Sequence, residues 1–112
     1  MEDCIFCKII KGEITSNIVY QDEDFVIFPD INPQAPIHYL AVPKKHFPLL
    51  KEMDEADKAA LGRILYKIST LESDLGLENG YRVLINQKGE QGNDAGQVVM
   101  HLHIHIMGGG KL

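Results

Sequence analysis

The stretch HLHIHI, residues 101–106, alternates histidine with apolar side chains without interruption. Successive side chains of a β-strand point to opposite faces, so a strand here would place His101, His103 and His105 together on one face. A helix would spread the same three rings around its axis. The alternation therefore predicts a strand over residues 97–107, ended by the glycines at 108–110.

The length and composition predict one soluble domain. A chain of 112 residues is long enough for one core and too short for two, so we expect a single domain over residues 1–112. No apolar run approaches the roughly 20 residues of a membrane-spanning helix. The N-terminal MEDCIFCKII also lacks the pattern of a secretory signal. We therefore expect a cytoplasmic protein that has no membrane partner.

The charge pattern bears on the class of partner. The net charge is −5, and the longest run of basic residues is Lys44-Lys45, which argues against a nucleic-acid surface. A small ligand that carries phosphate is still compatible with this net negative charge, because backbone N–H groups and a few polar side chains can hold one anion locally.

The remaining pattern predicts an α+β fold, with an antiparallel sheet of about five strands packed with one long and one short helix. The short helix is CIFCKIIKGE, which ends at Gly12. The long helix follows the N-cap Asp54, covers residues 55–76 and ends at Gly76. The other strands are expected at residues 16–22, 24–30, 37–46 and 80–87.

The cysteines form a C-x-x-C motif at Cys4 and Cys7. In a reducing compartment this spacing indicates metal binding or redox chemistry rather than a structural disulfide. A zinc site would need two further ligands, for which His46 and the histidines at 101–105 are available. The alternative is that both cysteines are small apolar residues on a short helix.

The histidine stretch allows three interpretations. Chance enrichment on an exposed strand is disfavoured, because three protonated rings on one face repel one another. A three-histidine zinc centre could activate water. A neutral imidazole, whose ordinary pKa is about 6.5, could instead attack phosphorus as a nucleophile.

The chain resembles the histidine triad (HIT) superfamily of nucleotide hydrolases and transferases. HLHIHIM matches its signature, and DAGQVVM with the trailing glycines resembles the Hint branch of nucleoside phosphoramidases. CIFCKIIKGEI, FPDINPQAPIHYLAVPKKH and GYRVLIN occur in the same order as in that family. The resemblance covers nearly the whole chain and implies a HIT-like fold.

The resemblance also implies catalytic roles for three histidines. His103 matches the nucleophile that takes the nucleotidyl group onto its ring, and His105 matches the residue that contacts the phosphate and the leaving group. His38, in PIHYL, matches a further histidine that supports the nucleophile's ring. A main-chain carbonyl near the neighbours of His103 in the strand is expected to fix its tautomer. Asp30 matches the carboxylate that accepts hydrogen bonds from the ribose hydroxyls, although a cap of the turn beside Asn32 is the alternative.

Further nucleotide contacts are carried over by position. Asn86 and Gln97 are candidates for the phosphate oxygens, with Asn93 as an alternative to Asn86. Val98 stands where Hint relatives often have a serine that helps to protonate the leaving group. The apolar slot for the base and the adjoining contacts comprise Ile5, Phe6, Ile14, Phe28, Leu40, Ile31 and Asn32.

Several members of the family that carry the C-x-x-C motif at the N-terminus bind zinc structurally. Their ligands match Cys4, Cys7, His46 and His101, and such a site leaves no open coordination position. This interpretation makes His101 a metal ligand and leaves His103 and His105 to face the substrate, with no cofactor required for catalysis.

The expected activity is cleavage of the P–N bond of purine nucleoside 5′-phosphoramidates, of the AMP-amine or AMP-lysine type, through a nucleotidyl-histidine intermediate. The alternatives are hydrolysis of dinucleoside polyphosphates, as in the Fhit branch, and a non-catalytic nucleotide-binding protein. The partners implied are a purine nucleotide and a second copy of the chain in a homodimer, with no nucleic acid.

Overall fold

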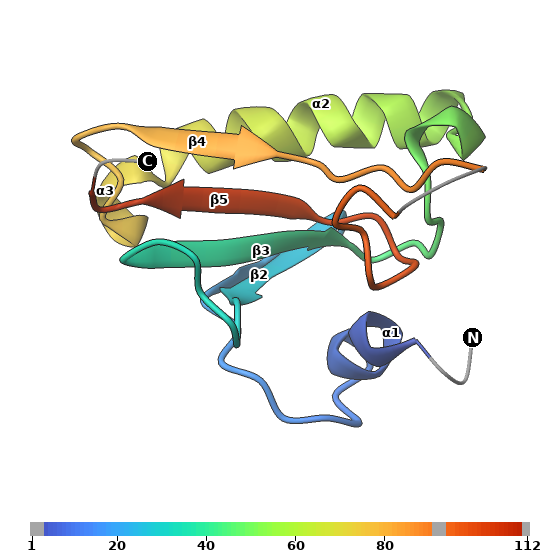
Figure 1. Cartoon of the computed structure of the whole chain (residues 1–112), viewed down its shortest axis with the longest axis horizontal. Helices are drawn as coiled ribbons and strands as arrows, with labels where there is room; N and C mark the ends of the chain where they lie inside the picture. Colours follow the sequence, from blue (N-terminus) through green and yellow to red (C-terminus); the bar gives the residue numbers. More distant parts are fainter. Residues whose placement is uncertain (1–3, 91–93, 111–112) are drawn as a thin grey trace.

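The computed structural model describes residues 4–90 and 94–110. Five strands form one antiparallel sheet in the order β1-β2-β3-β5-β4, with helices on both faces (Figure 1), which confirms the α+β class. In chain order the elements are α1 (Ile5–Ile10), β1 (Tyr20–Gln21), β2 (Phe25–Pro29), β3 (Ile37–Pro43), the 3₁₀ turn η1 (Leu50–Glu52), α2 (Glu55–Thr70), α3 (Glu72–Leu75), β4 (Tyr81–Leu84) and β5 (Ile104–Gly108).

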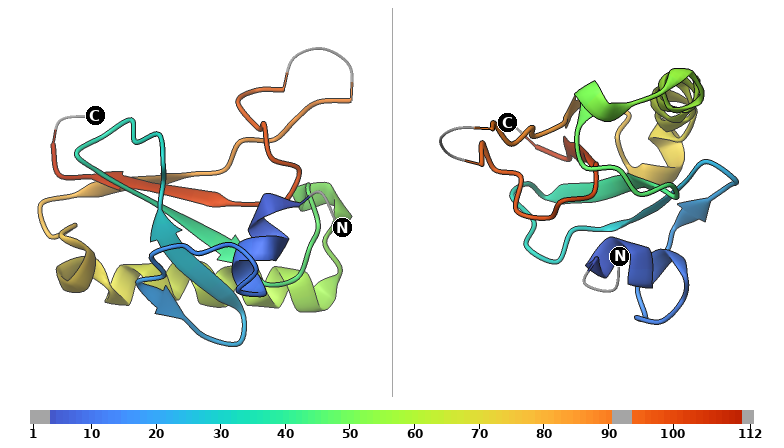
Figure 2. Two further views of the ribbon diagram at one scale, coloured as in Figure 1. Left: turned by 90° about the horizontal axis from the view of Figure 1, so that it is seen from below. Right: turned by 90° about the vertical axis from the view of Figure 1, so that its right-hand side faces the viewer.

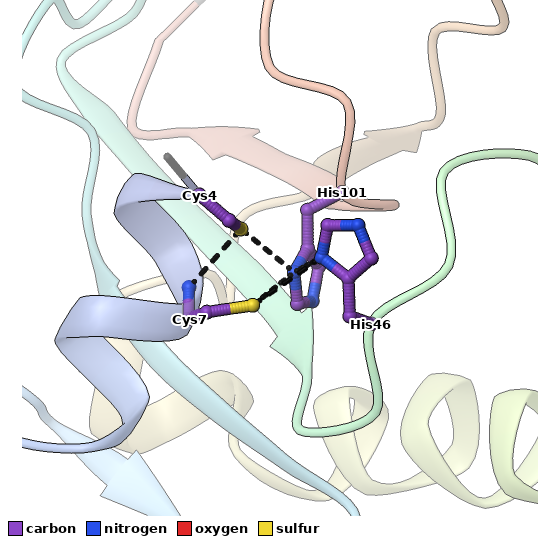
Figure 3. Close-up of side chains that lie close together, drawn as sticks. All are labelled: Cys4, Cys7, His46 and His101. Carbon is purple, nitrogen blue, oxygen red and sulfur yellow. Dashed lines mark hydrogen bonds between the residues drawn. The ribbon is translucent and has the colours of Figure 1, made fainter. Parts of the chain in front are cut away.

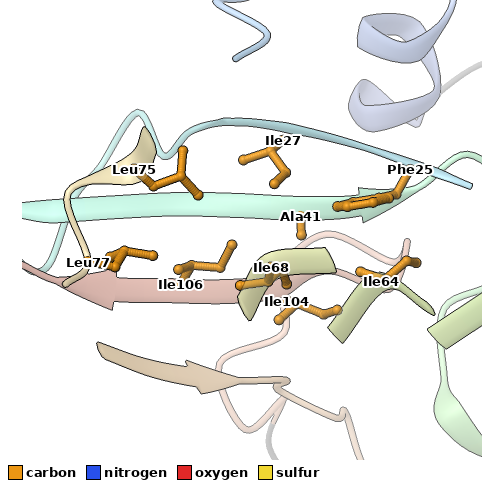
Figure 4. Packing of buried hydrophobic residues seen from close by; sticks show 9 residues of the cluster. All are labelled: Phe25, Ile27, Ala41, Ile64, Ile68, Leu75, Leu77, Ile104 and Ile106. Atoms are coloured by element: carbon orange, nitrogen blue, oxygen red, sulfur yellow. The ribbon is translucent and has the colours of Figure 1, made fainter. Parts of the chain in front are cut away.

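The larger core fills the space between the sheet and α2 (Figure 4). Its strand residues come from β2, β3 and β5, and Ile64 and Ile68 of α2 pack against them. Burial of each aliphatic side chain contributes about 1.5–3 kcal/mol. The buried members are Phe25, Ile27, Ala41, Ile64, Ile68, Leu75, Leu77, Ile104 and Ile106.

A smaller core lies on the opposite face of the sheet, under α1 (Figure 2). Phe6 and Ile9 of α1, the helix that Figure 2 shows against this face, pack with a second set of strand side chains, Val26, Phe28, Leu40 and Val42. The two cores use alternate residues of the same strands, as the two-residue period of a strand requires. Both faces of the central strands are therefore covered.

The strand register decides on which face the histidines of the sheet lie. In the antiparallel pair of β3 and β5, Leu40 is opposite His105 and His38 is opposite Met107. Directly opposed side chains share a face. Since Leu40 belongs to the core under α1, both His38 and His105 point to the α1 side of the sheet.

The strand that carries the histidines is shorter than the alternation predicts. β5 begins at Ile104, so the prediction of a strand from residue 97 is wrong for residues 97–103. The reason is that β3 ends at Pro43, which has no N–H to donate to a ladder. The N–H of Leu102 instead donates to the carbonyl of Phe47, 2.8 Å away.

Other boundaries also differ. The helix predicted over residues 55–76 is interrupted at Leu71, whose φ of −103° and ψ of 13° are not helical. The predicted N-cap is correct: the side chain of Asp54 accepts from the N–H of Asp57, which bonds back to Asp54. Gly76 ends α3 with φ at 74°, a left-handed conformation that suits glycine.

The strands at 16–22, 37–46 and 80–87 were each expected to be longer than β1, β3 and β4 are. Among the described residues, no helix combines the length and apolar character that crossing a membrane requires.

Two glycine substitutions test this packing in opposite directions. A methyl group at Gly108 of β5 would lie 2.8 Å from Cδ2 of the buried Leu77 and 3.1 Å from the carbonyl of Gly80, whereas one at Gly62 of α2 meets nothing within 4 Å. We expect Gly108→Ala to lower the free energy of unfolding by about 1–3 kcal/mol. Gly62→Ala should raise it by about 0.5–1 kcal/mol. Urea unfolding measures both, and equal effects would contradict the proposed packing.

Candidate functional site

Four side chains from distant parts of the sequence meet beside α1 (Figure 3). Cys4 is the N-cap of α1, and its Sγ accepts the N–H of Cys7 at 3.2 Å. His46 follows the end of β3, and His101 precedes β5. The donor atoms of all four lie within 4.8 Å of one another. We refer to Cys4, Cys7, His46 and His101 as the Cys–His cluster.

The donor atoms of the Cys–His cluster fit a tetrahedral metal ion. Nδ1 of His101 lies 3.3 Å from Sγ of Cys4, 3.5 Å from Sγ of Cys7 and 3.1 Å from Nδ1 of His46. In a regular zinc site, with bonds of about 2.0 Å to nitrogen and 2.3 Å to sulfur, neighbouring ligand atoms are about 3.3–3.8 Å apart. Two sulfur and two nitrogen donors leave no open position, which is typical of a structural site.

The protonation of His101 also suits a ligand. Its Nε2–H donates to the carbonyl of Pro43 at 2.7 Å, so Nδ1 of the neutral ring carries the lone pair that faces the cluster. Burial lowers the pKa of His101 to about 4. Burial, followed by the hydrogen bond and charge of Cys4, raises the pKa of the Cys7 thiol to about 11. A metal cation would replace that thiol proton.

His103 has its tautomer fixed by the main chain. Its Nδ1–H donates to the carbonyl of His101 at 2.8 Å, so Nε2 of the neutral ring keeps its lone pair. The ring lies between Phe6 and His105, with centroids at 5.2 and 5.0 Å respectively. An imidazole in this state is a nucleophile that needs no prior deprotonation.

A second chain of hydrogen bonds fixes His38 and His105. The N–H of Gln34 donates to Nδ1 of His38 at 2.9 Å, which places the proton of the neutral ring on Nε2. That Nε2–H donates to Nδ1 of His105 at 2.9 Å, so His105 carries its own proton on Nε2. Among the described residues, Nε2 of His105 is the buried side-chain nitrogen that has no hydrogen-bond partner. A buried N–H without a partner is an available donor for a bound anion.

The pKa of His105 agrees with this neutral state. Burial, and then the neighbouring charges of His103 and His38, lower it to about 4. His105 is therefore a neutral hydrogen-bond donor at pH 7 rather than a cation.

His38 was expected to support the ring of the nucleophile, His103. Its hydrogen bond goes instead to His105.

Asp30, His38 and His105 could also be considered as metal ligands, because their donor atoms lie within 4.8 Å of one another. The tautomers argue against it. Nε2 of His38, which faces the other two residues, carries a proton because Nδ1 accepts the N–H of Gln34. A protonated ring nitrogen has no lone pair for a metal. The group is therefore better described as a hydrogen-bonded chain.

Asp30 has two roles in the structure. Its Oδ1 accepts the N–H of Asn32 at 2.9 Å, which is the turn cap considered as the alternative to ribose binding. Its Oδ2 lies 3.3 Å from Nε2 of His38 and 3.9 Å from Nδ1 of His105. The carboxylate thus lies just after β2, beside His38 and His105.

The apolar residues expected around the base divide into two groups. Phe6, Phe28 and Leu40 are buried together in the smaller core. Ile5 and Ile14 are exposed on and just after α1, and Ile31 is 90% exposed. The structure therefore brings three of the expected slot residues together and leaves the others on the surface.

The expected phosphate contacts lie in the segment before β5. Gln97 is only 1% exposed, and its amide donates to the carbonyl of Pro48 and accepts the N–H of Lys88, each at 2.7 Å. It holds two loops together, so its amide is already occupied. Asn86 donates to the carbonyl of Ala95 at 2.9 Å, and Val98 is 82% exposed. Asn93 lies outside the described residues.

A main-chain carbonyl was the expected partner of His103, and the structure identifies it as that of His101. Sequence reasoning missed the N–H of Gln34 and the carbonyl of Pro43, which fix the tautomers of His38 and His101. Main-chain groups have the same chemistry in every residue, so no pattern of residue types could have identified these two.

Comparison with known proteins gives one family. A model of the HIT domain matches residues 11–112. A HIT-like protein of Synechocystis is 46% identical over 108 residues, which cover 96% of this chain and 91% of that protein.

Solved structures agree. A HIT family hydrolase from Clostridium thermocellum superposes with a TM-score of 0.86 at 42% identity, covering 100% of this chain and 95% of that one. A histidine triad nucleotide-binding protein from Candida albicans gives 0.78 at 38%, covering 93% and 73%. A zinc-bound histidine triad family protein from Mycobacterium smegmatis gives 0.77 at 30%, covering 96% and 75%.

The neutral state of His105 predicts a stability that depends on pH. Folding lowers its pKa from the ordinary 6.5 to about 4, so the unfolded chain binds the proton more readily between these values. The stabilisation is fully present above about pH 6.5 and is lost as the pH falls toward 4.

We therefore expect the wild-type protein to lose about 1–2 kcal/mol more than His105→Asn between pH 7.5 and pH 5. Asparagine keeps an acceptor for His38 and does not titrate. Urea unfolding at both pH values, with a chelator present throughout, measures the difference. Equal losses in the two proteins would contradict a lowered pKa at His105.

Proposed function

The chain belongs to the HIT domain family, and on that premise we propose that it hydrolyses the P–N bond of purine nucleoside 5′-phosphoramidates through a covalent intermediate on His103. The observation that carries this proposal is the pair of tautomers. Because Nδ1–H of His103 donates to the carbonyl of His101, Nε2 of His103 has a free lone pair. The neighbouring ring of His105 offers an unpartnered Nε2–H.

In the first step Nε2 of His103 attacks the phosphorus, and the P–N bond breaks. The electron pair of that bond leaves with the nitrogen, which takes a proton from solvent and departs as an amine. The hydrogen bond to the carbonyl of His101 stabilises the positive charge that develops on the nucleotidyl-imidazole ring. The Nε2–H of His105 donates to a phosphate oxygen as negative charge accumulates there.

In the second step water attacks the phosphorus, and the bond from phosphorus to Nε2 breaks. The electron pair returns to Nε2 of His103, the water releases a proton, and the nucleoside monophosphate leaves. His105 keeps its Nε2 proton throughout. A donated proton would have to be replaced through His38, whose own partner is the main-chain N–H of Gln34, and an amide N–H does not release its proton. This suits a neutral ring whose pKa is about 4.

Binding of the nucleotide is assigned to the same face of the sheet. Asp30 would accept hydrogen bonds from the ribose hydroxyls. Its side chain is partly exposed, and its Oδ2 lies beside His38, so a nucleotide at the histidines would lie near it. Phe6, Phe28 and Leu40 would form the inner wall for the purine. The nucleotide-binding histidine triad protein of Candida albicans supports a nucleotide as the ligand.

Brief mixing with adenosine 5′-phosphoramidate, followed by intact-protein mass spectrometry, tests the intermediate. The wild-type protein should gain one adenylyl group transiently, and His103→Ala should gain none and lose activity by about 10⁴-fold or more. Faster turnover of diadenosine triphosphate would favour polyphosphate hydrolysis instead. Binding without turnover would remove the enzymatic assignment. If the substrate is turned over without an adduct and a chelator abolishes that turnover, metal-activated water would be favoured.

We further propose that the Cys–His cluster holds one structural zinc ion. Zinc there would supply a cross-link between α1, the segment after β3 and the segment before β5, and no catalytic chemistry. The donor distances and the tautomer of His101 support this assignment, as does the zinc-bound relative from Mycobacterium smegmatis.

Elemental analysis of the purified protein should find about one zinc per chain, and Cys7→Ser should retain much less. His103→Ala is the matched control, because it changes a neighbouring histidine outside the cluster and should keep its zinc. Equal zinc contents in the Cys7→Ser and wild-type proteins would contradict the assignment.

A further inference from the structure

Phe6 links the Cys–His cluster to His103. It lies between Cys4 and Cys7 in the sequence, and its side chain is buried. Its ring makes edge contacts with His101 at 5.9 Å and with His103 at 5.2 Å between centroids, at interplanar angles of 74° and 79°. The ring that packs against His103 is therefore carried on the same turn of α1 as the two cysteines.

The hydrogen bond to the carbonyl of His101 does not by itself orient His103. A single hydrogen bond at Nδ1 restrains rotation about the Cβ–Cγ bond, but a hydrogen bond tolerates about 30° of misalignment, so the ring keeps some freedom to tilt. The second restraint comes from packing, with Phe6 and His105 contacting the ring at 5.2 and 5.0 Å. Edge-to-face contacts of aromatic rings contribute about 0.5–1.5 kcal/mol each, which is enough to favour one orientation.

Both restraints lead back to the Cys–His cluster. The carbonyl that accepts from His103 belongs to His101, whose ring is held by Pro43 on one side and faces the two sulfur atoms on the other. Of the two packing contacts, the one from Phe6 is carried between the two sulfur ligands, whereas the one from His105 is not connected to the cluster. The paths through Phe6 and through the carbonyl of His101 do not pass through the residues expected to bind ribose or phosphate.

We propose that Phe6 is a positioning residue for His103, and that metal bound at the Cys–His cluster fixes the orientation of the His103 ring through Phe6 and the carbonyl of His101. This inference rests on the proposed role of His103 as the nucleophile. Its consequence is that the metal controls the rate of nucleotidyl transfer as well as the stability of the fold. Misplacement of a reacting atom by about 1 Å can cost about 100-fold in rate.

Phe28 supplies a matched control for Phe6. It belongs to the same core and contacts the ring of Phe6 at 5.7 Å, and its described ring contacts do not include His103. Both phenylalanines are expected to contact the purine, so the two leucine variants are compared as nucleotide-free proteins. In that state a role limited to base binding leaves the His103 ring unchanged in both variants, whereas positioning changes it in Phe6→Leu alone.

The test compares Phe6→Leu with Phe28→Leu by NMR of nucleotide-free protein labelled with ¹⁵N-histidine. We expect the Nδ1 and Nε2 signals of His103, whose ¹⁵N separation reports the tautomer and the Nδ1 hydrogen bond rather than the ring current of Phe6, to move closer together and broaden in Phe6→Leu and to keep their wild-type separation in Phe28→Leu. Steady-state kinetics with adenosine 5′-phosphoramidate should show kcat about tenfold lower in Phe6→Leu, and about the wild-type kcat in Ile9→Val, which changes a buried residue of the same core that has no proposed contact with the nucleotide. Zinc content should be unchanged in all variants, because all four ligands remain.

Removal of the metal gives a second measurement. Chelation of the wild-type protein should move the ring signals of His103 in the same direction as Phe6→Leu does, and added zinc should restore them. If chelation unfolds the protein, the leucine variants decide the question. If Phe6→Leu does not fold, Phe6→Met, which removes the ring but keeps a long apolar side chain, replaces it.

Unchanged His103 signals in the Phe6 variant would overturn the inference, and so would equal changes in both leucine variants. These results are separate from a failure of the proposed function. Loss of the adenylyl adduct in the wild-type protein would remove His103 as the nucleophile, while the NMR comparison needs no nucleotide and no turnover.

Discussion

The pairing of β3 with β5 is the constraint on which the rest of the structure depends. It places Leu40 opposite His105 and His38 opposite Met107, so that both histidines leave the sheet on the side of α1. The same pairing sends Ile104 and Ile106 into the core under α2. A shift of this register by one residue would exchange the two faces, burying the imidazoles among aliphatic side chains and exposing the isoleucines. The stability of the larger core therefore also fixes the position of the candidate site.

Main-chain groups complete the chemistry of that site. The carbonyl of His101 and the N–H of Gln34 each bind one ring nitrogen, and together they determine which nitrogen carries the proton in His103, His38 and His105. Main-chain groups are held by the fold and do not titrate near neutral pH, so the tautomers persist without a charged partner. The result is a lone pair on His103 beside an unpartnered N–H on His105, in a protein whose net charge is negative.

The early end of β3 has a consequence for the arrangement of the site. Because Pro43 cannot continue the ladder, the segment before β5 leaves the sheet, and Pro43 is free to accept Nε2–H of His101. The ring of His101 then faces Cys4 and Cys7 of α1, while its carbonyl still reaches His103. One residue thus belongs to both the Cys–His cluster and the neighbourhood of the proposed nucleophile.

The sequence by itself determined the α+β class, the N-cap at Asp54, the stop at Gly76 and the alternation that separates the histidines from the isoleucines, because these depend on local periodicity and on the chemistry of single residues. Resemblance supplied the four residues that the structure brings together as the Cys–His cluster. Only the tertiary structure decided where β5 begins, that Gln97 braces two loops, that His38 bonds to His105, and which nitrogen of each ring carries the proton. These features arise from main-chain groups and side chains that are distant in the sequence, and no local pattern of residue types records which of them will meet.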